Sequence, residues 1–142
     1  MGFTTPCFIR KNTPELRKKL EYLGYSHGKP EYYADDDDNE YDFIMCHNGR
    51  FFLLSQKNHV IRNGHPLKKH GSINCGTNEP LFLAIAALRN DTDKNQWFTD
   101  GDKWIQCPEI KFSTYWAYND IEVDIDNIHK ATVNELIKHF KG

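Results

Sequence analysis

Cys75 is the residue whose type and position best suit covalent chemistry. It stands shortly before an apolar run, residues 81–88, that is expected to form a helix. A thiol at a helix start meets unpaired backbone amides and the positive end of the helix dipole, which favour the reactive thiolate. A cysteine hydrolase would also need a general base, and His129 and His47 are the candidates, although neither has a diagnostic spacing. Because cysteine is among the residues most often buried, inert packing of Cys75 is the interpretation we favour.

A zinc site is the second chemistry that these residue types allow. His65, His70 and Cys75 are spaced five and five, and Cys46 or His47 could complete the set. Zinc accepts imidazole and thiolate ligands, but its usual motifs separate paired ligands by about two to five residues in a more regular pattern. No CxxC pair is present either. We therefore predict no metal ion and no other cofactor.

Two segments of the chain carry opposite charge. Residues 35–40 read DDDDNE, without the glycine that the tight turn of a calcium loop requires, so a solvated loop is the preferred interpretation. Residues 57–70 contain no acidic residue and are a candidate contact for phosphate or nucleic acid. The candidate binding residues there are Arg62, His65, Lys68, Lys69 and His70. Aromatic residues that would stack on bases are missing from this segment, so we favour a plain solvated connection.

The composition indicates a folded protein without a global attraction to polyanions. The chain has 142 residues and a formal net charge of −2, with seven Tyr, nine Phe and three Trp. Large aromatic side chains supply the apolar area that offsets chain entropy, and this length suits one globular domain spanning 1–142. The first ten residues lack the basic start and long apolar stretch of a secretory signal. We expect a cytoplasmic protein that does not bind membranes, with free thiols at its four cysteines.

A core helix at about residues 78–89 is the element that would position Cys75. Asn78 or Thr77 can cap its first amides, and Pro80 fits the first turn. Eight consecutive apolar residues follow, at 81–88, without the polar positions that a surface helix shows. Both sides of this helix must therefore be covered by other elements.

Two amphipathic helices are expected at the ends of the chain. The first follows a Thr13 cap and Pro14, carries an apolar stripe and stops at Gly24. The second spans residues 132–141, where Thr132 and Glu135 have capping-box spacing. Each would pack one face against the rest of the domain.

The remaining apolar segments predict strands. Residues 43–55 form a hairpin around Asn48-Gly49, and residues 96–107 form a second one around Asp100-Gly101. Residues 112–118 and 121–125 are expected to be a further pair of strands. The fold class is therefore α+β, a largely antiparallel sheet of short strands and hairpins with two or three helices.

Two segments of the chain share a pattern that an internal duplication would produce. Residues 7–55 and 72–107 each contain an isoleucine, a threonine four residues later, an acidic first helical turn and then a hairpin with Asn-Gly or Asp-Gly. A degenerate repeat would explain this, and so would the common requirement of helices for caps and acidic first turns. The sequence leaves both explanations open.

These observations favour a small non-catalytic binding or interaction protein, whose partner would be another protein or a small molecule. The alternatives are a cysteine-dependent hydrolase using Cys75 with His129, and a nucleic-acid- or phosphate-binding protein using residues 57–70. Nucleic acid is the less favoured partner. No spacing in the chain identifies the ligand.

Overall fold

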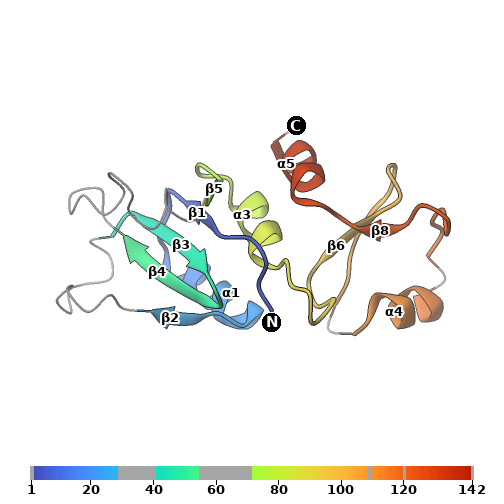
Figure 1. The fold of residues 1–142 in the computed structure, drawn as a ribbon, viewed down its shortest axis with the longest axis horizontal. Coiled ribbons are helices and arrows are strands. Elements are labelled where there is room, and N and C mark those ends of the chain that lie inside the picture. Colours follow the sequence, from blue (N-terminus) through green and yellow to red (C-terminus); the bar gives the residue numbers. More distant parts are fainter. Residues whose placement is uncertain (1, 29–40, 55–71, 109, 120, 142) are drawn as a thin grey trace.

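A computed structural model describes residues 2–28, 41–54, 72–108, 110–119 and 121–141. Within these residues the chain forms four helices and two sheets, so the predicted α+β class is confirmed. Figure 1 shows one sheet at one end of the molecule, the second sheet at the other end, and helices α3 and α5 between them. The acidic segment 35–40 and the basic segment 57–70 lie outside the described residues.

The larger sheet has five strands in the order β2-β4-β3-β1-β5. Their bounds are β1 (Cys7–Ile9), β2 (Ser26–Gly28), β3 (Phe43–His47), β4 (Arg50–Leu54) and β5 (Ile73–Asn74). The central pairs β1·β3 and β3·β4 are antiparallel, whereas the outer pairs β1·β5 and β2·β4 are parallel. The sheet is therefore mixed, and its antiparallel part is the β3–β4 hairpin with β1 beside it.

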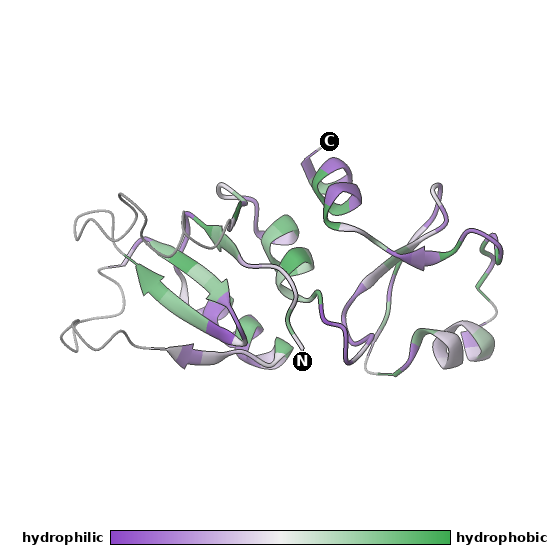
Figure 2. Cartoon of the chain, viewed as in Figure 1, coloured by the Kyte–Doolittle hydropathy of each residue, from purple (hydrophilic) through white to green (hydrophobic). Residues whose placement is uncertain are grey.

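The β3–β4 hairpin confirms the turn predicted at Asn48-Gly49. Both turn residues have positive φ, 51° at Asn48 and 79° at Gly49, as a type I′ turn requires. Opposite residues pair in register across the hairpin, for example Met45 with Phe52. Figure 2 shows these two strands and α3 coloured largely as hydrophobic, in agreement with a central position for both arms.

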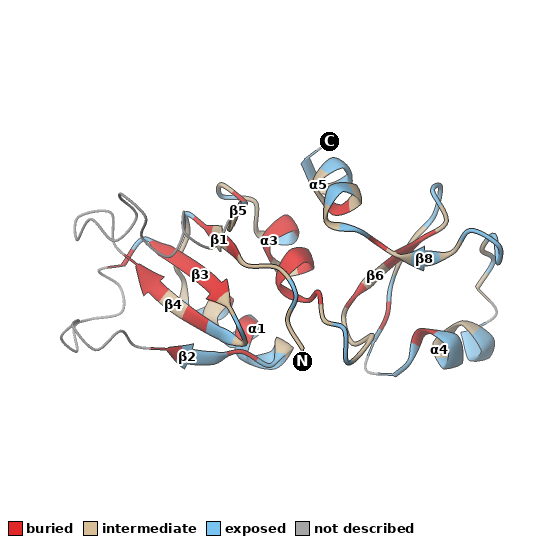
Figure 3. Ribbon diagram, in the orientation of Figure 1, coloured by how far each residue is buried: buried red, intermediate tan, exposed pale blue. Residues whose placement is uncertain are grey.

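Helices α1 (Pro14–Leu23) and α3 (Glu79–Ala86) begin where the caps predicted. The side chains of Thr13 and Asn78 each accept a hydrogen bond from the amide three residues later, at 3.1 Å. These caps satisfy amides that have no partner inside the helix. Helix α3 is buried over most of its length, as Figure 3 shows, and so confirms the predicted core helix.

The second sheet has three strands in the order β7-β6-β8. They are β6 (Trp97–Thr99), β7 (Trp104–Gln106) and β8 (His129–Lys130), and both pairings are antiparallel. The β6–β7 hairpin was predicted, whereas β8 was not. Helix α5 (Val133–Lys141) follows β8 directly. Its capping box is formed as expected, because Thr132 and Glu135 exchange hydrogen bonds of 2.9 and 3.2 Å between side chain and backbone.

The expectation of strands at 112–118 and 121–125 was wrong. Residues Phe112–Asn119 form helix α4, and no strand is present at 121–125. The helix begins under a cap from a distant residue, since the Asp93 carboxylate accepts a hydrogen bond of 3.0 Å from the Phe112 amide. The Phe112 ring also stacks on Phe98, with 4.0 Å between ring centroids. Both contacts come from tertiary structure, which overrides the strand preference of aromatic residues.

One hydrophobic core connects the two sheets into a single small domain. It contains buried residues from β1, α1, β3, β4 and α3, together with Leu136 of α5 and Ala131 just before that helix. Trp97 and Trp104 of the second sheet pack against the same cluster. The two hairpins of the suggested repeat lie in different sheets, β3–β4 beside β1 and β6–β7 apart from β5. The duplication stays a prediction.

Candidate functional site

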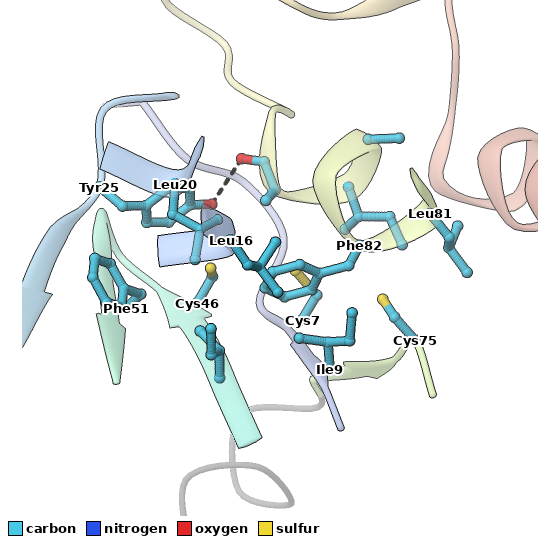
Figure 4. Close-up of a cluster of buried hydrophobic side chains, with 14 of the residues drawn as sticks. Cys7, Ile9, Leu16, Leu20, Tyr25, Cys46, Phe51, Cys75, Leu81 and Phe82 are labelled. Carbon is cyan, nitrogen blue, oxygen red and sulfur yellow. Dashed lines mark hydrogen bonds between the residues drawn. The ribbon is translucent and has the colours of Figure 1, made fainter. Parts of the chain in front are cut away.

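Cys75 follows β5 and turns its thiol into the core rather than toward the amides of α3. The residue is 2% exposed. Contact with the Cys7 thiol and burial raise the pKa of the Cys75 thiol well above its ordinary value. Figure 4 shows Cys7 between Cys46 and Cys75, with all three among apolar side chains such as Phe82. An uncharged, buried thiol is a poor nucleophile, so the geometry supports packing.

His129, the suggested general base, lies on β8 of the other sheet. Its Nδ1 is 2.7 Å from the Asn127 carbonyl, and its Nε2 is 2.9 Å from both carboxylate oxygens of Glu135. These contacts raise the pKa of the imidazole, the larger cause being the Asn127 carbonyl. Both ring nitrogens are thus engaged by Asn127 and Glu135, and neither contact involves Cys75.

The basic candidates Arg62, His65, Lys68, Lys69 and His70 lie outside the described residues, and their role stays a prediction. Within the described part of the chain, no group of His, Cys, Asp or Glu side chains is arranged to hold a metal ion. The structure contains a different candidate site, which the sequence did not indicate.

That site is a cleft of about 610 Å³ on the protein. Four parts of the chain line it: α1 and the segment before it, α3, the β6–β7 hairpin, and α5. The lining residues are Lys11, Lys19, Thr77, Glu79, Pro80, Leu83, Ala84, Trp97, Gln106 and Phe140. Ligand pockets typically occupy about 300–1,000 Å³ and combine mainly apolar walls with a few convergent polar groups, which is the composition seen here.

The polar rim of the cleft is built around Glu79, in the first turn of α3. Its two carboxylate oxygens accept hydrogen bonds from Lys11 Nζ at 2.8 Å and from Lys19 Nζ at 3.0 Å. These ammonium groups lower the pKa of the Glu79 carboxyl, Lys11 having the larger effect. The carboxylate therefore stays ionised, and it holds two cations side by side at the mouth of the cleft.

The apolar wall is formed by aromatic rings from two elements. Trp97 of β6 and Phe140 of α5 meet edge to face, with 5.5 Å between ring centroids and 69° between ring planes. Asn78 Nδ2 donates a hydrogen bond of 3.0 Å to the Phe140 carbonyl, so the α3 cap also fixes the end of α5. Pro80 and Leu83 line the same cleft from α3. The cleft walls are thus held by secondary structure rather than by long loops.

A smaller hollow of about 150 Å³ continues the cleft and shares Lys19, Leu83 and Gln106 with it. Asn95 lines this hollow with a left-handed backbone, at φ 62°. Its Nδ2 is buried and has no hydrogen-bond partner, although Gln106 Nε2 donates to its backbone carbonyl at 3.1 Å. A buried amide donor without a protein acceptor is rare in folded proteins.

Sequence reasoning missed this cleft because its residues are ordinary when taken one by one. Lys19 lies on the solvent-facing side of the amphipathic helix α1, and Lys11 lies in the segment just before that helix. Trp97 lies in one strand of a hairpin. One local signal was present. Trp97 and Gln106 are directly opposite in the β6–β7 register, so their side chains share one face of the hairpin.

The comparisons with known proteins identify no relative. No protein-family model, no curated protein and no solved structure matches this chain. None of the helices in the described part of the chain combines the length and the apolar character needed to cross a membrane.

Proposed function

We propose that this protein is a small binding protein that holds a small-molecule ligand in the cleft between α1, α3, α5 and the β6–β7 hairpin. The observation that carries the proposal is the cleft itself, about 610 Å³ with aromatic and aliphatic walls and a charged rim. Concave sites of this kind lie preferentially where separate structural units meet. The ionisable groups that line the cleft, Lys11, Lys19 and Glu79, are engaged with one another in ion pairs, and the proposal is binding without turnover.

The alternative of a thiol hydrolase receives no support from the geometry. Cys75 is not among the residues that line the cleft, and its thiol is buried with a raised pKa. The free state of all four cysteines supports residence in a reducing compartment, and cytoplasmic location is part of the proposal.

The test uses three naphthalene probes that differ only in charge: 2-naphthoate, 2-naphthamide and 2-naphthylmethylammonium. Each is titrated into the ¹⁵N-labelled protein, and backbone, side-chain amide and indole resonances are followed by NMR. We expect saturable shifts at Trp97, Gln106 and Asn95 for at least one probe, because these residues line the two hollows. Shifts confined to other parts of the chain, or no saturation with any probe, would overturn the proposal.

A blocking variant makes the test specific to the cleft. Leu83 lines both hollows, and Leu83→Trp would fill the space that a ligand needs. Ile125→Trp is the matched control, since Ile125 is 64% exposed and does not line the cleft. We expect Leu83→Trp to abolish the shifts and Ile125→Trp to retain them. Thermal unfolding of both variants verifies that each is folded.

A further inference from the structure

We infer that the ligand of this cleft is a planar aromatic molecule with one negative charge, such as an aromatic carboxylate. The inference rests on the proposed function and specifies the ligand class for the same site. It follows from the charge balance at the rim, the excess of hydrogen-bond donors there and the angle between the Trp97 and Phe140 rings.

The charge balance favours a monoanion. Lys11 and Lys19 bring two positive charges to the cleft, and Glu79 is the one carboxylate among its lining residues. Each ammonium group has three donors, of which one is directed at Glu79. Their side chains are 41% and 56% exposed, so both remain accessible to a ligand. One uncompensated positive charge matches a single negative charge and repels a cation.

The excess of hydrogen-bond donors at the rim also favours a negatively charged ligand. The Lys11 and Lys19 ammonium groups each have N–H groups that are not directed at Glu79, whereas the Glu79 oxygens are already paired with these ammonium groups. A ligand that supplies acceptors would therefore complete the site, and a carboxylate supplies two oxygens with several lone pairs. The lysine N–H groups gain most from a charged acceptor, because charge-assisted hydrogen bonds are about twice as strong as neutral ones.

The apolar wall selects the shape of the rest of the ligand. The ring planes of Trp97 and Phe140 stand at 69°, which makes a corner between two aromatic surfaces. A planar ring placed parallel to one of them presents its edge to the other, and both arrangements are favourable for aromatic pairs. The aliphatic side chains of Pro80 and Leu83 line the same space. A flat aromatic body therefore fits this corner better than a flexible chain.

The experiment compares the three naphthalene probes by isothermal titration calorimetry at low and at physiological salt. We expect 2-naphthoate to bind about tenfold or more tightly than 2-naphthamide, a difference of about 1.4 kcal/mol. The ammonium probe should bind most weakly, and the naphthoate preference should shrink as salt rises. If the amide equals the carboxylate, or the ammonium probe binds best, the ligand class is wrong while the binding cleft stands. If none of the probes binds, the proposed function itself fails.

Charge-removal variants link the preference to the named residues. Lys19→Gln should reduce the ratio of carboxylate to amide affinity by several fold, whereas Lys18→Gln, a neighbouring exposed lysine that does not line the cleft, should leave it unchanged. In the double variant Lys11→Gln/Lys19→Gln the Glu79 charge is uncompensated, so the order of the charged probes should reverse. Retention of the wild-type ratio in the double variant would overturn the inference, and thermal unfolding verifies the fold.

Discussion

The Tyr25 hydroxyl donates a hydrogen bond of 2.8 Å to the Ala86 carbonyl, at the C-terminal end of α3. Figure 4 shows this bond inside the core, close to Leu20. The last carbonyls of a helix have no partner within the helix, and a buried one needs a donor from elsewhere. Tyr25, which follows α1 and precedes β2, supplies that donor across the core and thereby ties the two helices that flank the cleft.

Removing this donor should destabilise the protein. Tyr25→Phe retains the ring but leaves the Ala86 carbonyl unpaired in a buried place, which costs about 1–3 kcal/mol of unfolding free energy. Urea denaturation followed by circular dichroism measures the change. Tyr118→Phe is the matched control, because Tyr118 is 84% exposed and its substitution should change stability by less than about 0.5 kcal/mol. Equal effects of the two substitutions would contradict the role of the buried bond.

The four cysteines should be unreactive in the folded protein. All are buried free thiols, and burial raises the pKa of the Cys107 thiol to about 11. Because the thiolate is the reactive form, a disulfide reagent such as 5,5′-dithiobis(2-nitrobenzoate) should modify no cysteine at pH 7 and all four in denaturant. Peptide mapping identifies any labelled site. Rapid native labelling of Cys75 near pH 6 would contradict this prediction and restore the case for a hydrolase.

The Glu135–His129 pair should make stability depend on pH in two directions. Hydrogen bonding to the Thr132 amide lowers the pKa of Glu135 below its ordinary 4.5. The contribution of the Glu135 carboxylate to the free energy of unfolding is therefore present above pH 4.5 and is lost as pH falls through the lowered pKa. The Asn127 carbonyl and Glu135 raise the pKa of His129 above its ordinary 6.5. The contribution of the protonated His129 ring to the free energy of unfolding is therefore complete below pH 6.5 and is lost as pH rises through the raised pKa. The pair should therefore stabilise most at about pH 5–6.

Glu135→Gln tests this dependence. The stability difference between wild type and variant, measured by urea denaturation from pH 3 to pH 9, should be largest at about pH 5–6 and decline on both sides. The ion pair is partly exposed, so its share should be a few tenths to about 1 kcal/mol. Glu122→Gln is the control, because the Glu122 side chain is 94% exposed. A pH-independent difference for Glu135→Gln would show that the ionised groups contribute nothing.

Gly24, the residue that ends α1, should tolerate alanine less well than Gly101. Both have a left-handed backbone, with φ of 110° and 104°, so both substitutions carry a conformational cost of about 1–2 kcal/mol. A Cβ at Gly24 would also lie 2.7 Å from Arg89 Nη1, whereas a Cβ at Gly101 would meet nothing within 4 Å. Arg89 is held by Asp91 and by the Leu23 carbonyl, so it cannot yield without losing those bonds.

Chemical denaturation of Gly24→Ala and Gly101→Ala measures the two costs. We expect the larger loss for Gly24→Ala, and the difference between them isolates the displacement of Arg89. Equal losses would mean that Arg89 moves aside freely.

Sequence patterns that span only a few residues account for much of the agreement between the predicted and the observed fold. The cap at Thr13, the capping box of α5 and the Asn48-Gly49 turn were predicted correctly, and the cap of α3 is Asn78, one of the two residues predicted for it. Each depends on residues within a few positions of one another, so the chain needs no distant partner to express it. The apolar run in α3 also predicted burial correctly, because a helix that is apolar on all sides is stable in a globular protein only when other elements cover it.

Helix α4 shows where local rules were insufficient. Its aromatic composition resembles that of a strand, yet Phe112, Tyr115 and Trp116 have the i, i+3, i+4 spacing of a helical stripe and pack in one cluster. The two patterns compete within a short segment. The contacts of Phe112 with Asp93 and Phe98 resolve the competition, and neither residue is a neighbour in the chain.

The positions of helix starts, hairpin turns and the buried helix are properties of the amino-acid order, because they arise from backbone and side-chain groups only a few bonds apart. The cleft and the surroundings of the Cys75 thiol cannot be read from the amino-acid order in this way. Lys11, Glu79, Trp97 and Phe140 come from segments up to 129 positions apart and meet because α3 packs between α1, α5 and the second sheet. Likewise Cys75 is inert because Cys7 and the core surround it. Packing over such separations depends on the whole set of apolar contacts and is decided only when the chain folds.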